Sequence, residues 1–349
     1  QVLESELLHQ KTAQQAEAAA GVIMDADTGE VLAIASLPAF NANAPGGFVG
    51  MPSHMNRITL GVYELGSTFK PLTVAMGLQE GTIRSLAEIY QTGPMRVGRH
   101  SIRDFGGGRA TMTVPEILIR SSNVGTARMA EALGKERQKA YLKKIGFLDR
   151  VPAEILEKGR TLYPSDQNWG LSSVMTIGFG HGIAVTPLHL ATAYATLVNG
   201  GIQRPATFLR VAKAPAGERV FSEEVSKASR AMLRAAVTDG TGRRADAPGY
   251  RLGGKTGTAE KPRPGGGYFR DRNITTFAGA FPMDDPRYVV VLMLDDPRGN
   301  GGSRTAGATI APAVANVVLR IAPVLGVEPD ETKEPDLSMI EGLYQVRRR

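Results

Sequence analysis

The stretch at residues 20–36 reads AGVIMDADTGEVLAIAS. Two runs rich in apolar and β-branched residues flank an Asp-Thr-Gly at 27–29, and Asp and Gly form tight turns between strands. This pattern predicts a β-hairpin near the start of the chain. Three further runs of strand character follow in the last third of the chain, at residues 250–260, 275–281 and 288–294.

Helical patterns occupy both ends and the middle of the chain. Thr113 and Glu116 have the spacing of a capping box, and Pro71 fits the first turn of a helix that begins at Ser67. A Ser-Ser-Asn at 121–123 interrupts the helical pattern, and Gly134 ends it. The predicted helices are residues 2–19, 67–79, 113–120, 124–133, 186–199, 222–238 and 306–325.

These elements predict one α/β (α+β) domain. The two strand-rich ends are expected to form a single antiparallel sheet flanked by the terminal helices, and the helical middle a second, all-helical lobe. A cleft between the two lobes is the expected place for a functional site. Residues 37–60, rich in Pro, Asn and Gly, are predicted to be a loop.

The composition excludes several classes of function. The 349 residues include no cysteine, which rules out a thiol nucleophile, disulfides and thiolate metal sites. The net charge is +7, but aromatic residues are only 6% and no stretch combines them with dense Lys and Arg, so we expect no nucleic-acid partner. No apolar run reaches the roughly 18 residues of a membrane span. The five histidines lack the spacing of metal ligands, and we expect neither a metal nor a cofactor.

Ser67 and Lys70 form the first candidate catalytic pair. Three residues apart at a helix start, the two side chains share a face, and the positive end of the helix dipole favours an alkoxide at Ser67. Lys70 could take the proton of Ser67 if burial or a neighbouring cation lowered the pKa of Lys70. Alone, the pattern S-x-x-K is weak, because roughly one such match is expected by chance in a chain of this length; a capping Ser and a surface Lys remain the alternative.

The Ser-Ser-Asn at 121–123 lies at a break between two predicted helices. There the Ser121 hydroxyl could relay a proton to a leaving amine, and the Asn123 amide could hold a substrate amide. A simple helix cap is the alternative, and for this motif alone it is the more common explanation.

Lys255, Thr256, Gly257 and Thr258 lie within a predicted strand. Glycine in a strand often marks the close approach of another backbone, and here a peptide substrate could pair with the strand edge. Two hydroxyls and an ammonium group could also bind a carboxylate. An ordinary exposed edge strand is the alternative.

The chain thus contains S-x-x-K, S-x-N and K-T-G in this order, each on the element that its chemistry needs. This set is the known signature of penicillin-binding proteins and class A β-lactamases. The chain resembles class B penicillin-binding proteins in their peptidoglycan transpeptidase domain, also in YELGSTFKP, GFGHGIAVTPLHLATAYATLVNGG and DGTGRRADAPGYRLGGKTGTAE. The S-S-N followed by VGTA, and TTFAGAFP after the K-T-G strand, are similar to the septal, division-specific members.

The resemblance implies a penicillin-binding, β-lactamase-like transpeptidase fold and a Ser67 acyl-enzyme. It implies catalytic roles for Ser67, Lys70, Ser121, Asn123 and Lys255. It implies substrate-binding roles for Ser122, Thr256, Gly257 and Thr258. The implied substrates are stem peptides that end in D-Ala-D-Ala, and β-lactams would acylate the same serine.

The resemblance also implies a setting for the protein. We expect residues 20–325 to form the transpeptidase domain, residues 1–19 to be a remnant of an N-terminal pedestal or a leading helix, and residues 326–349 to be a C-terminal tail with a mobile basic end at 347–349. The expected location is the periplasmic face of the bacterial inner membrane, with an N-terminal anchor helix outside this chain. The expected partners are a membrane glycosyltransferase and division proteins.

Two other readings of the same motifs remain open. In the first, water is the acceptor, which would make the protein a D,D-carboxypeptidase or a β-lactamase of the same fold. No Glu-bearing loop matches the deacylating element of a class A β-lactamase. In the second, the domain is a β-lactam sensor or an inactive scaffold.

Two polar features outside the three motifs are expected to have no catalytic role. His181 stands between two glycines, a pattern that predicts a tight turn near the cleft rather than a base. Asp295 and Asp296 follow a predicted strand and are expected at its solvated end.

Overall fold

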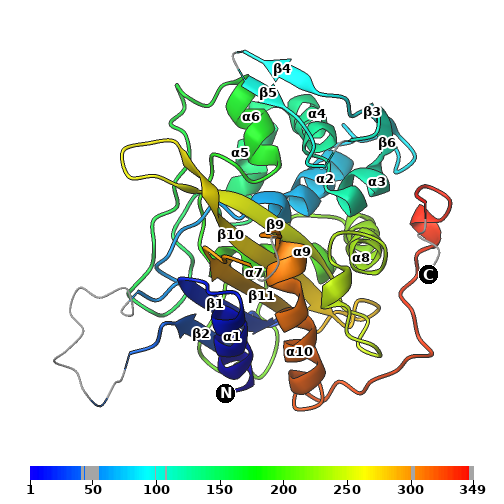
Figure 1. Cartoon of the computed structure of the whole chain (residues 1–349). Coiled ribbons are helices and arrows are strands. Elements are labelled where there is room, and N and C mark those ends of the chain that lie inside the picture. Colours follow the sequence, from blue (N-terminus) through cyan, green and yellow to red (C-terminus); the bar gives the residue numbers. More distant parts are fainter. Residues whose placement is uncertain (41–42, 44–54, 99, 107, 300–302, 346–349) are drawn as a thin grey trace.

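The computed structural model describes residues 1–40, 43, 55–98, 100–106, 108–299 and 303–345. Its centre is a five-stranded antiparallel sheet with the strand order β2-β1-β11-β10-β9 (Figure 1). The strands are β1 (Ala18–Asp25), β2 (Val31–Leu37), β9 (Gly253–Pro262), β10 (Tyr268–Phe281) and β11 (Tyr288–Asp295). The predicted joining of the two strand-rich ends in one sheet is therefore confirmed.

The β1–β2 hairpin turns where the sequence predicts. The Asp25 carboxylate accepts hydrogen bonds from the backbone N–H groups of Asp27 (2.9 Å) and Thr28 (2.7 Å), and Gly29 adopts φ 78°. A positive φ is a conformation that glycine adopts without steric cost. The carboxylate that organises the turn thus belongs to the last residue of β1.

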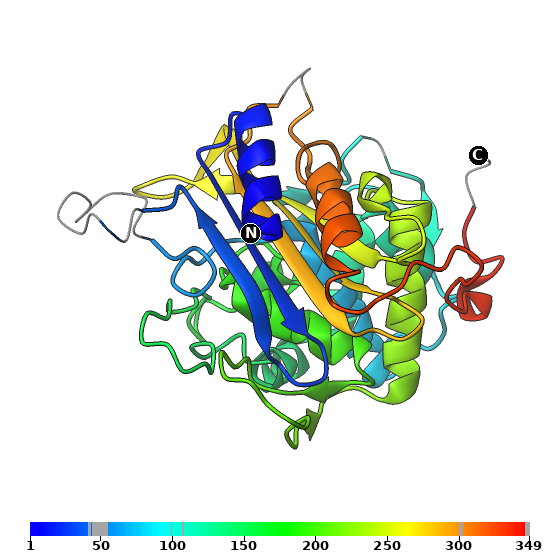
Figure 2. The same cartoon turned by 90° about the horizontal axis from the view of Figure 1, so that it is seen from below.

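Both faces of the sheet are covered by helices (Figure 2). In β11, Val290 and Leu292 pack in a cluster with α1 (Val2–Ala13) and α10 (Ala311–Ile321). Val289 and Val291 point to the other face, in the cluster that contains α7 (Pro187–Val198). Because side chains of a strand alternate between faces, burial of both faces explains why β11 is a continuous apolar run.

The helical middle of the chain forms a second lobe beside β9, but this lobe is not all-helical as predicted, because it also contains short strands. Its other helices are α2 (Lys70–Gln79), α3 (Val114–Arg120), α4 (Asn123–Leu133), α5 (Lys135–Lys144), α6 (Leu171–Gly178) and α8 (Glu223–Thr238). Short strands complete the lobe: β3 (Ile89–Gln91), β4 (Met95–Val97), β5 (His100–Ile102), β6 (Thr111–Thr113), β7 (Ile202–Gln203) and β8 (Glu218–Arg219). The predicted capping box at the start of α3 is confirmed, with Thr113 and Glu116 each bonding the backbone of the other.

Several element boundaries differ from the prediction. The first helix ends at Ala13, and the chain enters β1 at Ala18. The α-helix predicted from Ser67 begins at Lys70, after a 3-10 turn, η2 (Gly66–Phe69), so that Pro71 falls in its first turn. The last helix divides at Ile310 into α9 (Ala306–Thr309) and α10. Helices α5 and α6 were not predicted; each begins directly after a glycine, Gly134 and Gly170.

The prediction of a solvated end at Asp295 and Asp296 is wrong. Asp295 lies 2.6 Å from the Lys261 ammonium, and Asp296 lies 2.7 Å from the Arg272 guanidinium and is only 5% exposed. These cations come from β9 and β10, which pair beside β11, so they meet the carboxylates only in the folded sheet.

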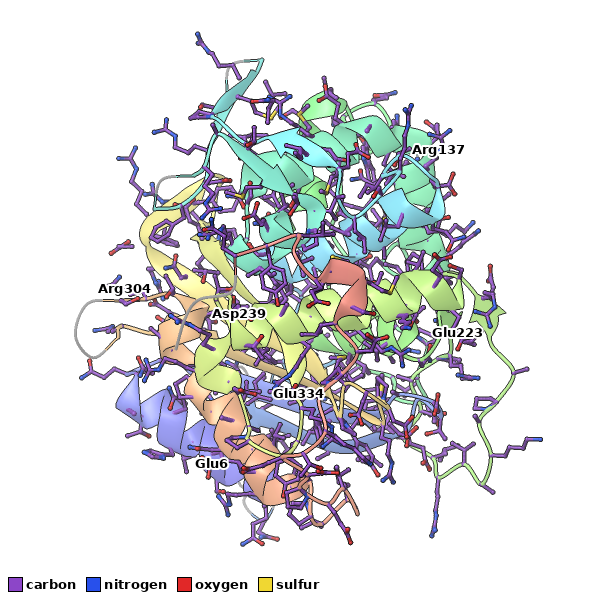
Figure 3. The ribbon with its side chains drawn as sticks, turned by 90° about the vertical axis from the view of Figure 1, so that its right-hand side faces the viewer. Glu6, Arg137, Glu223, Asp239, Arg304 and Glu334 are labelled. Carbon is purple, nitrogen blue, oxygen red and sulfur yellow. The ribbon has the colours of Figure 1, made fainter. Side chains whose placement is uncertain are left out.

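The C-terminal segment, residues 327–345, turns back along the helical lobe. Figure 3 shows it beside α8, with Glu334 below that helix and Asp239 at the C-terminal end of the helix. Ile340, in the short 3-10 helix η4 (Ser338–Ile340), is fully buried among side chains of α3 and α8. The predicted mobile end at 347–349 lies outside the described residues.

No helix in the described part of the chain is both long and apolar enough to cross a membrane. The longest helix, α8, has 16 residues and carries charged side chains on one face. Within the same described residues, no group of three His, Cys, Asp or Glu side chains is arranged to hold a metal ion.

Close backbone packing between the two lobes leads to a first prediction. A Cβ at Gly257 would lie 2.2 Å from the carbonyl oxygen of Leu65. We expect Gly257→Ala to lower the free energy of unfolding by about 1–3 kcal/mol, because backbone atoms must move to admit the methyl group. Urea denaturation monitored by circular dichroism measures this change.

The matched control is Gly93→Ala, since a Cβ there meets no heavy atom within 4 Å. It should change the free energy of unfolding by no more than about 0.5 kcal/mol. Equal stability of the two variants would contradict the close approach at Gly257.

Candidate active site

Ser67 and Lys70 lie on the turn that leads into α2. In a 3-10 turn, side chains at i and i+3 are eclipsed, so the two residues project from the same side. Ser67 is half-buried, whereas Lys70 is fully buried. The turn is held from behind, because the buried Tyr194 hydroxyl of α7 donates a 2.8 Å hydrogen bond to the Thr68 carbonyl.

The Lys70 ammonium points at the Ser-Ser-Asn break. Its Nζ lies 2.5 Å from the Ser121 carbonyl oxygen, 3.1 Å from Ser121 Oγ and 2.7 Å from Asn123 Oδ1. Burial, and secondly the nearby charge of Lys255, hold the pKa of Lys70 well below the ordinary lysine value. This lowering of the Lys70 pKa is in the direction that a general base requires.

The Ser-Ser-Asn break forms the junction between α3 and α4. Ser121 ends α3 in the left-handed conformation, with φ 65° and ψ 43°, and Ser122 caps α4 by accepting the Gly125 N–H at 3.0 Å. The predicted helix cap is thus present together with the polar cluster. The Ser122 hydroxyl is 1% exposed and is used by the cap, so the geometry gives no support to a substrate contact through that side chain.

Asp104 holds this junction, and sequence reasoning missed it. Its carboxylate accepts hydrogen bonds from Ser122 Oγ (2.6 Å) and from the N–H groups of Asn123 (2.6 Å) and Val124 (3.0 Å). A carboxylate at a helix N-terminus satisfies otherwise unpaired N–H groups and interacts favourably with the helix dipole. Asp104 follows β5, so the β4–β5 hairpin is tied to the first turn of α4.

Lys255 reaches the same serine from the edge strand β9. Its Nζ donates to Ser121 Oγ at 2.9 Å and to the Thr256 carbonyl at 3.1 Å, and lies 3.4 Å from Thr241 Oγ1. Burial lowers the pKa of Lys255 to about 7. The Ser121 hydroxyl therefore bridges two buried amines that belong to different lobes.

The rest of the K-T-G strand lines the site with two hydroxyls. Thr256 Oγ1 lies 2.6 Å from Thr241 Oγ1, and the exposed Thr258 accepts the Ala306 N–H at 2.9 Å through Oγ1. Gly257 marks a close backbone approach, as the sequence indicated, but the approaching backbone is that of Leu65. That contact sets the nucleophile turn directly against the strand.

His181 lies in the predicted tight turn, between Gly180 (φ 81°) and Gly182 (φ 80°). Its Nδ1 is 2.9 Å from Glu64 Oε2, and this hydrogen-bonded carboxylate raises the pKa of His181. A cavity of about 470 Å³ extends from Asn123 to His181 and is also lined by Arg103. This cavity is next to the lysine pair through Asn123, whose Oδ1 accepts the hydrogen bond from Lys70.

A model of the penicillin-binding protein transpeptidase domain matches residues 19–319 of the chain. The chain belongs to this family. Two curated relatives are named peptidoglycan D,D-transpeptidase FtsI: a probable one from Caulobacter vibrioides, 38% identical over 93% of this chain, and one from Escherichia coli, 34% identical over 90%. The chain spans about half the length of these relatives, 57% and 53% respectively.

Solved structures agree with this assignment. The transpeptidase domain of Burkholderia pseudomallei penicillin-binding protein 3 superposes with a TM-score of 0.84 at 29% identity, covering 94% of this chain and 95% of that one. Penicillin-binding protein 3 from Mycobacterium tuberculosis, solved with aztreonam, gives a TM-score of 0.82 at 29% identity, covering 94% and 77%. The fold predicted from the resemblance is therefore confirmed.

The Asp104 cap yields a second prediction. In Asp104→Asn, an amide replaces a carboxylate that accepts three hydrogen bonds, so one acceptor oxygen and the negative charge are lost. We expect the free energy of unfolding to fall by about 1–3 kcal/mol. Acylation by a fluorescent penicillin should also slow, because Asn123 begins the helix that loses its cap.

Asp166→Asn serves as the matched control. Asp166 lies on the surface, where its carboxylate pairs with Lys139 and its backbone carbonyl accepts from Lys135. Its unfolding midpoint and acylation rate should equal those of the wild-type protein. A normal acylation rate in Asp104→Asn would show that the cap does not position Asn123.

Proposed function

We propose that this domain is a peptidoglycan D,D-transpeptidase with Ser67 as its nucleophile. The observation that carries the proposal is the Ser121 hydroxyl, placed 3.1 Å from Lys70 Nζ and 2.9 Å from Lys255 Nζ, beside the turn that bears Ser67. Such a bridge can pass a proton between a base and a leaving group. The names of the FtsI relatives support the same activity.

The acylation step uses these groups in turn. Neutral Lys70 takes the proton of Ser67 Oγ as this oxygen attacks the carbonyl between two terminal D-alanines. An ester bond forms to Ser67, and the peptide C–N bond breaks. The leaving amine of D-alanine receives its proton from Ser121, which regains one from the adjacent lysines.

Deacylation runs the acylation steps in reverse, with a different amine as the attacking group. An amino group of a second stem peptide attacks the ester carbonyl and gives its proton to the relay. The new amide bond cross-links the two peptides and releases Ser67 with its hydroxyl restored. The products therefore contain the same number of peptide bonds as the substrates.

The strand supplies binding and electrostatic stabilisation in this proposal. The backbone N–H groups of Ser67 and Thr258 form the oxyanion hole, a contribution that can reach several kcal/mol. Thr256 and Thr258 bind the terminal carboxylate, and Gly257 keeps the strand close to the nucleophile turn. Asn123 holds Lys70 in place and contacts the substrate amide.

β-Lactams are proposed to acylate Ser67 as substrate mimics. The similar penicillin-binding protein 3 from Mycobacterium tuberculosis was solved in complex with aztreonam. The four-membered lactam amide would be opened by the same attack, and the acyl group would stay on the serine.

We further propose that the domain acts in septal cell-wall synthesis. Support comes from the resemblance of the S-S-N-V-G-T-A and T-T-F-A-G-A-F-P stretches to division-specific members and from the FtsI relatives. In this proposal, residues 20–325 are the transpeptidase unit at the periplasmic face of the inner membrane, and residues 1–19 and 326–349 flank it. An anchor helix outside this chain, a membrane glycosyltransferase and division proteins complete the setting.

Nitrocefin turnover separates this proposal from a β-lactamase. A transpeptidase should give a stoichiometric burst followed by slow release, whereas sustained rapid hydrolysis would favour water as the acceptor. Release of D-alanine from a stem pentapeptide without cross-linked product would favour a carboxypeptidase. Acylation without reaction of any stem peptide would favour a sensor.

The nucleophile assignment gives a third prediction. Ser67→Ala should abolish covalent labelling by a fluorescent penicillin, since it removes the proposed attacking oxygen. The variant should keep the wild-type unfolding midpoint. Mass spectrometry of the wild-type protein after β-lactam exposure should show one adduct, on the peptide that contains Ser67. Labelling that survives the substitution would mean that another residue is the nucleophile.

The buried amines give a fourth prediction, on pH dependence. The base is Lys70 in its neutral form, which is lost as the pH falls through the pKa of Lys70. Because burial and Lys255 hold that pKa well below 10.5, the ascending limb of the acylation rate should lie far below pH 10. Stopped-flow acylation between pH 5 and pH 10 measures it. An ascending limb centred near 10.5 would exclude neutral Lys70 as the base at physiological pH.

A further inference from the structure

The C-terminal segment contacts the domain at several points along its described length. Near its start, the Asp330 N–H donates to the Gly249 carbonyl at 2.8 Å. Further along, the Glu334 carboxylate accepts two hydrogen bonds of 3.1 Å from Arg234, an α8 side chain with only 5% exposure. Ile340 is then fully buried. These contacts hold the segment 327–345 against the domain that it flanks.

The last residues of the segment contact two elements that lead into the active site. The Leu343 carbonyl accepts a 2.5 Å hydrogen bond from Thr113 Oγ1, at the N-cap of α3. The Tyr344 side chain lines a cavity together with Asp239, the C-cap residue of α8, and with Thr241. Helix α3 ends at Arg120, directly before Ser121, and α8 ends at Thr238, three residues before Thr241. Both helices therefore lead to a neighbour of Lys255.

The loop after α8 has little room to move. A Cβ at Gly240 would lie 2.6 Å from the Ile119 carbonyl oxygen and 2.7 Å from that of Ala236. The backbone of Thr241 also passes close to α9, because a Cβ at Gly307 would lie 2.6 Å from the Thr241 carbonyl oxygen. The backbone of this loop therefore packs closely against α3, α8 and α9. This packing orients the Thr241 side chain.

Thr241 points at the K-T-G strand. Its hydroxyl lies 2.6 Å from Thr256 Oγ1 and 3.4 Å from Lys255 Nζ. A lysine side chain has four rotatable bonds and loses up to about 2 kcal/mol of rotamer entropy when it is fixed. Neighbours that hold its Nζ in one place before the reaction thus favour the geometry in which it meets Ser121.

We propose that Thr241 is a positioning residue for Lys255, and that the C-terminal segment holds Thr241 in place through Tyr344 and Asp239. The segment touches neither substrate nor reacting atoms. It acts by fixing the ends of α3 and α8 relative to one another, so that the Ser121 and Thr241 hydroxyls both contact Lys255 Nζ. The inference rests on the proposed function, because acylation is its principal readout.

The first test removes the Thr241 hydroxyl and then restores it. Thr241→Val keeps the shape of the side chain, and we expect the acylation rate constant for a fluorescent penicillin to fall about tenfold with unchanged non-covalent affinity. Thr241→Ser should recover most of the rate. The control is Thr12→Val, which removes a likewise exposed hydroxyl in α1 and should leave the rate unchanged. A Val variant as fast as wild type, or a Ser variant as slow as Val, would overturn the proposal.

The second test is a double-mutant cycle between the segment and the loop. Tyr344→Phe removes one hydroxyl and keeps the ring, and it should slow acylation about threefold in the wild-type background. In the Thr241→Val background, Tyr344→Phe should have no further effect on the acylation rate, because the contact between the Thr241 hydroxyl and Lys255 is already lost. Additive effects would show that the segment does not act through Thr241. The exposed Lys333→Ala change, in the same segment, is the control and should be silent.

A crystal structure of Thr241→Val supplies a readout that needs no activity. We expect Lys255 Nζ to leave the position 2.9 Å from Ser121 Oγ. An unmoved Lys255 would overturn the positioning role even if the protein proved to be no transpeptidase. A wild-type protein that forms no β-lactam adduct would contradict the proposed function, and the crystal structure would still decide the inference.

Discussion

Two fully buried lysines, Lys70 and Lys255, approach one serine hydroxyl from different lobes of the molecule. Two ammonium groups cannot share a site of low dielectric without cost, so burial and mutual repulsion favour the loss of a proton. In the proposed mechanism this produces a neutral base beside a charged amine at the same pH. No dedicated histidine or carboxylate is needed, because the exclusion of water supplies the shift in pKa.

The architecture maintains that exclusion by close packing. The nucleophile turn is supported by Tyr194 from behind and by strand β9 in front, where Leu65 meets Gly257 without an intervening side chain. The sheet is filled on both faces, so β9 has a rigid base. Each lysine therefore enters the cleft from an element whose position is set by apolar contacts on the side away from the solvent.

Local sequence patterns predicted the elements that carry the chemistry. The helix start at Ser67, the break at 121–123 and the edge strand at Lys255 each have a local signal, and in space they meet. Asp104 had no such signal: a single Asp in a glycine-rich stretch, 18 residues before Ser122, acquires its function only when the hairpin folds over α4. Asp295 and Asp296 were misjudged for the same reason, since their cations come from other strands.

The Asp104 carboxylate joins two parts of the molecule that border the cleft. It accepts the N–H of Asn123, whose side-chain oxygen in turn accepts from Lys70 at 2.7 Å. A movement of the β4–β5 hairpin that widens the cleft would therefore also change the hydrogen bonding of Lys70. A bulky ligand that pushed the hairpin outward would uncap α4 and loosen the acceptor that orients Lys70.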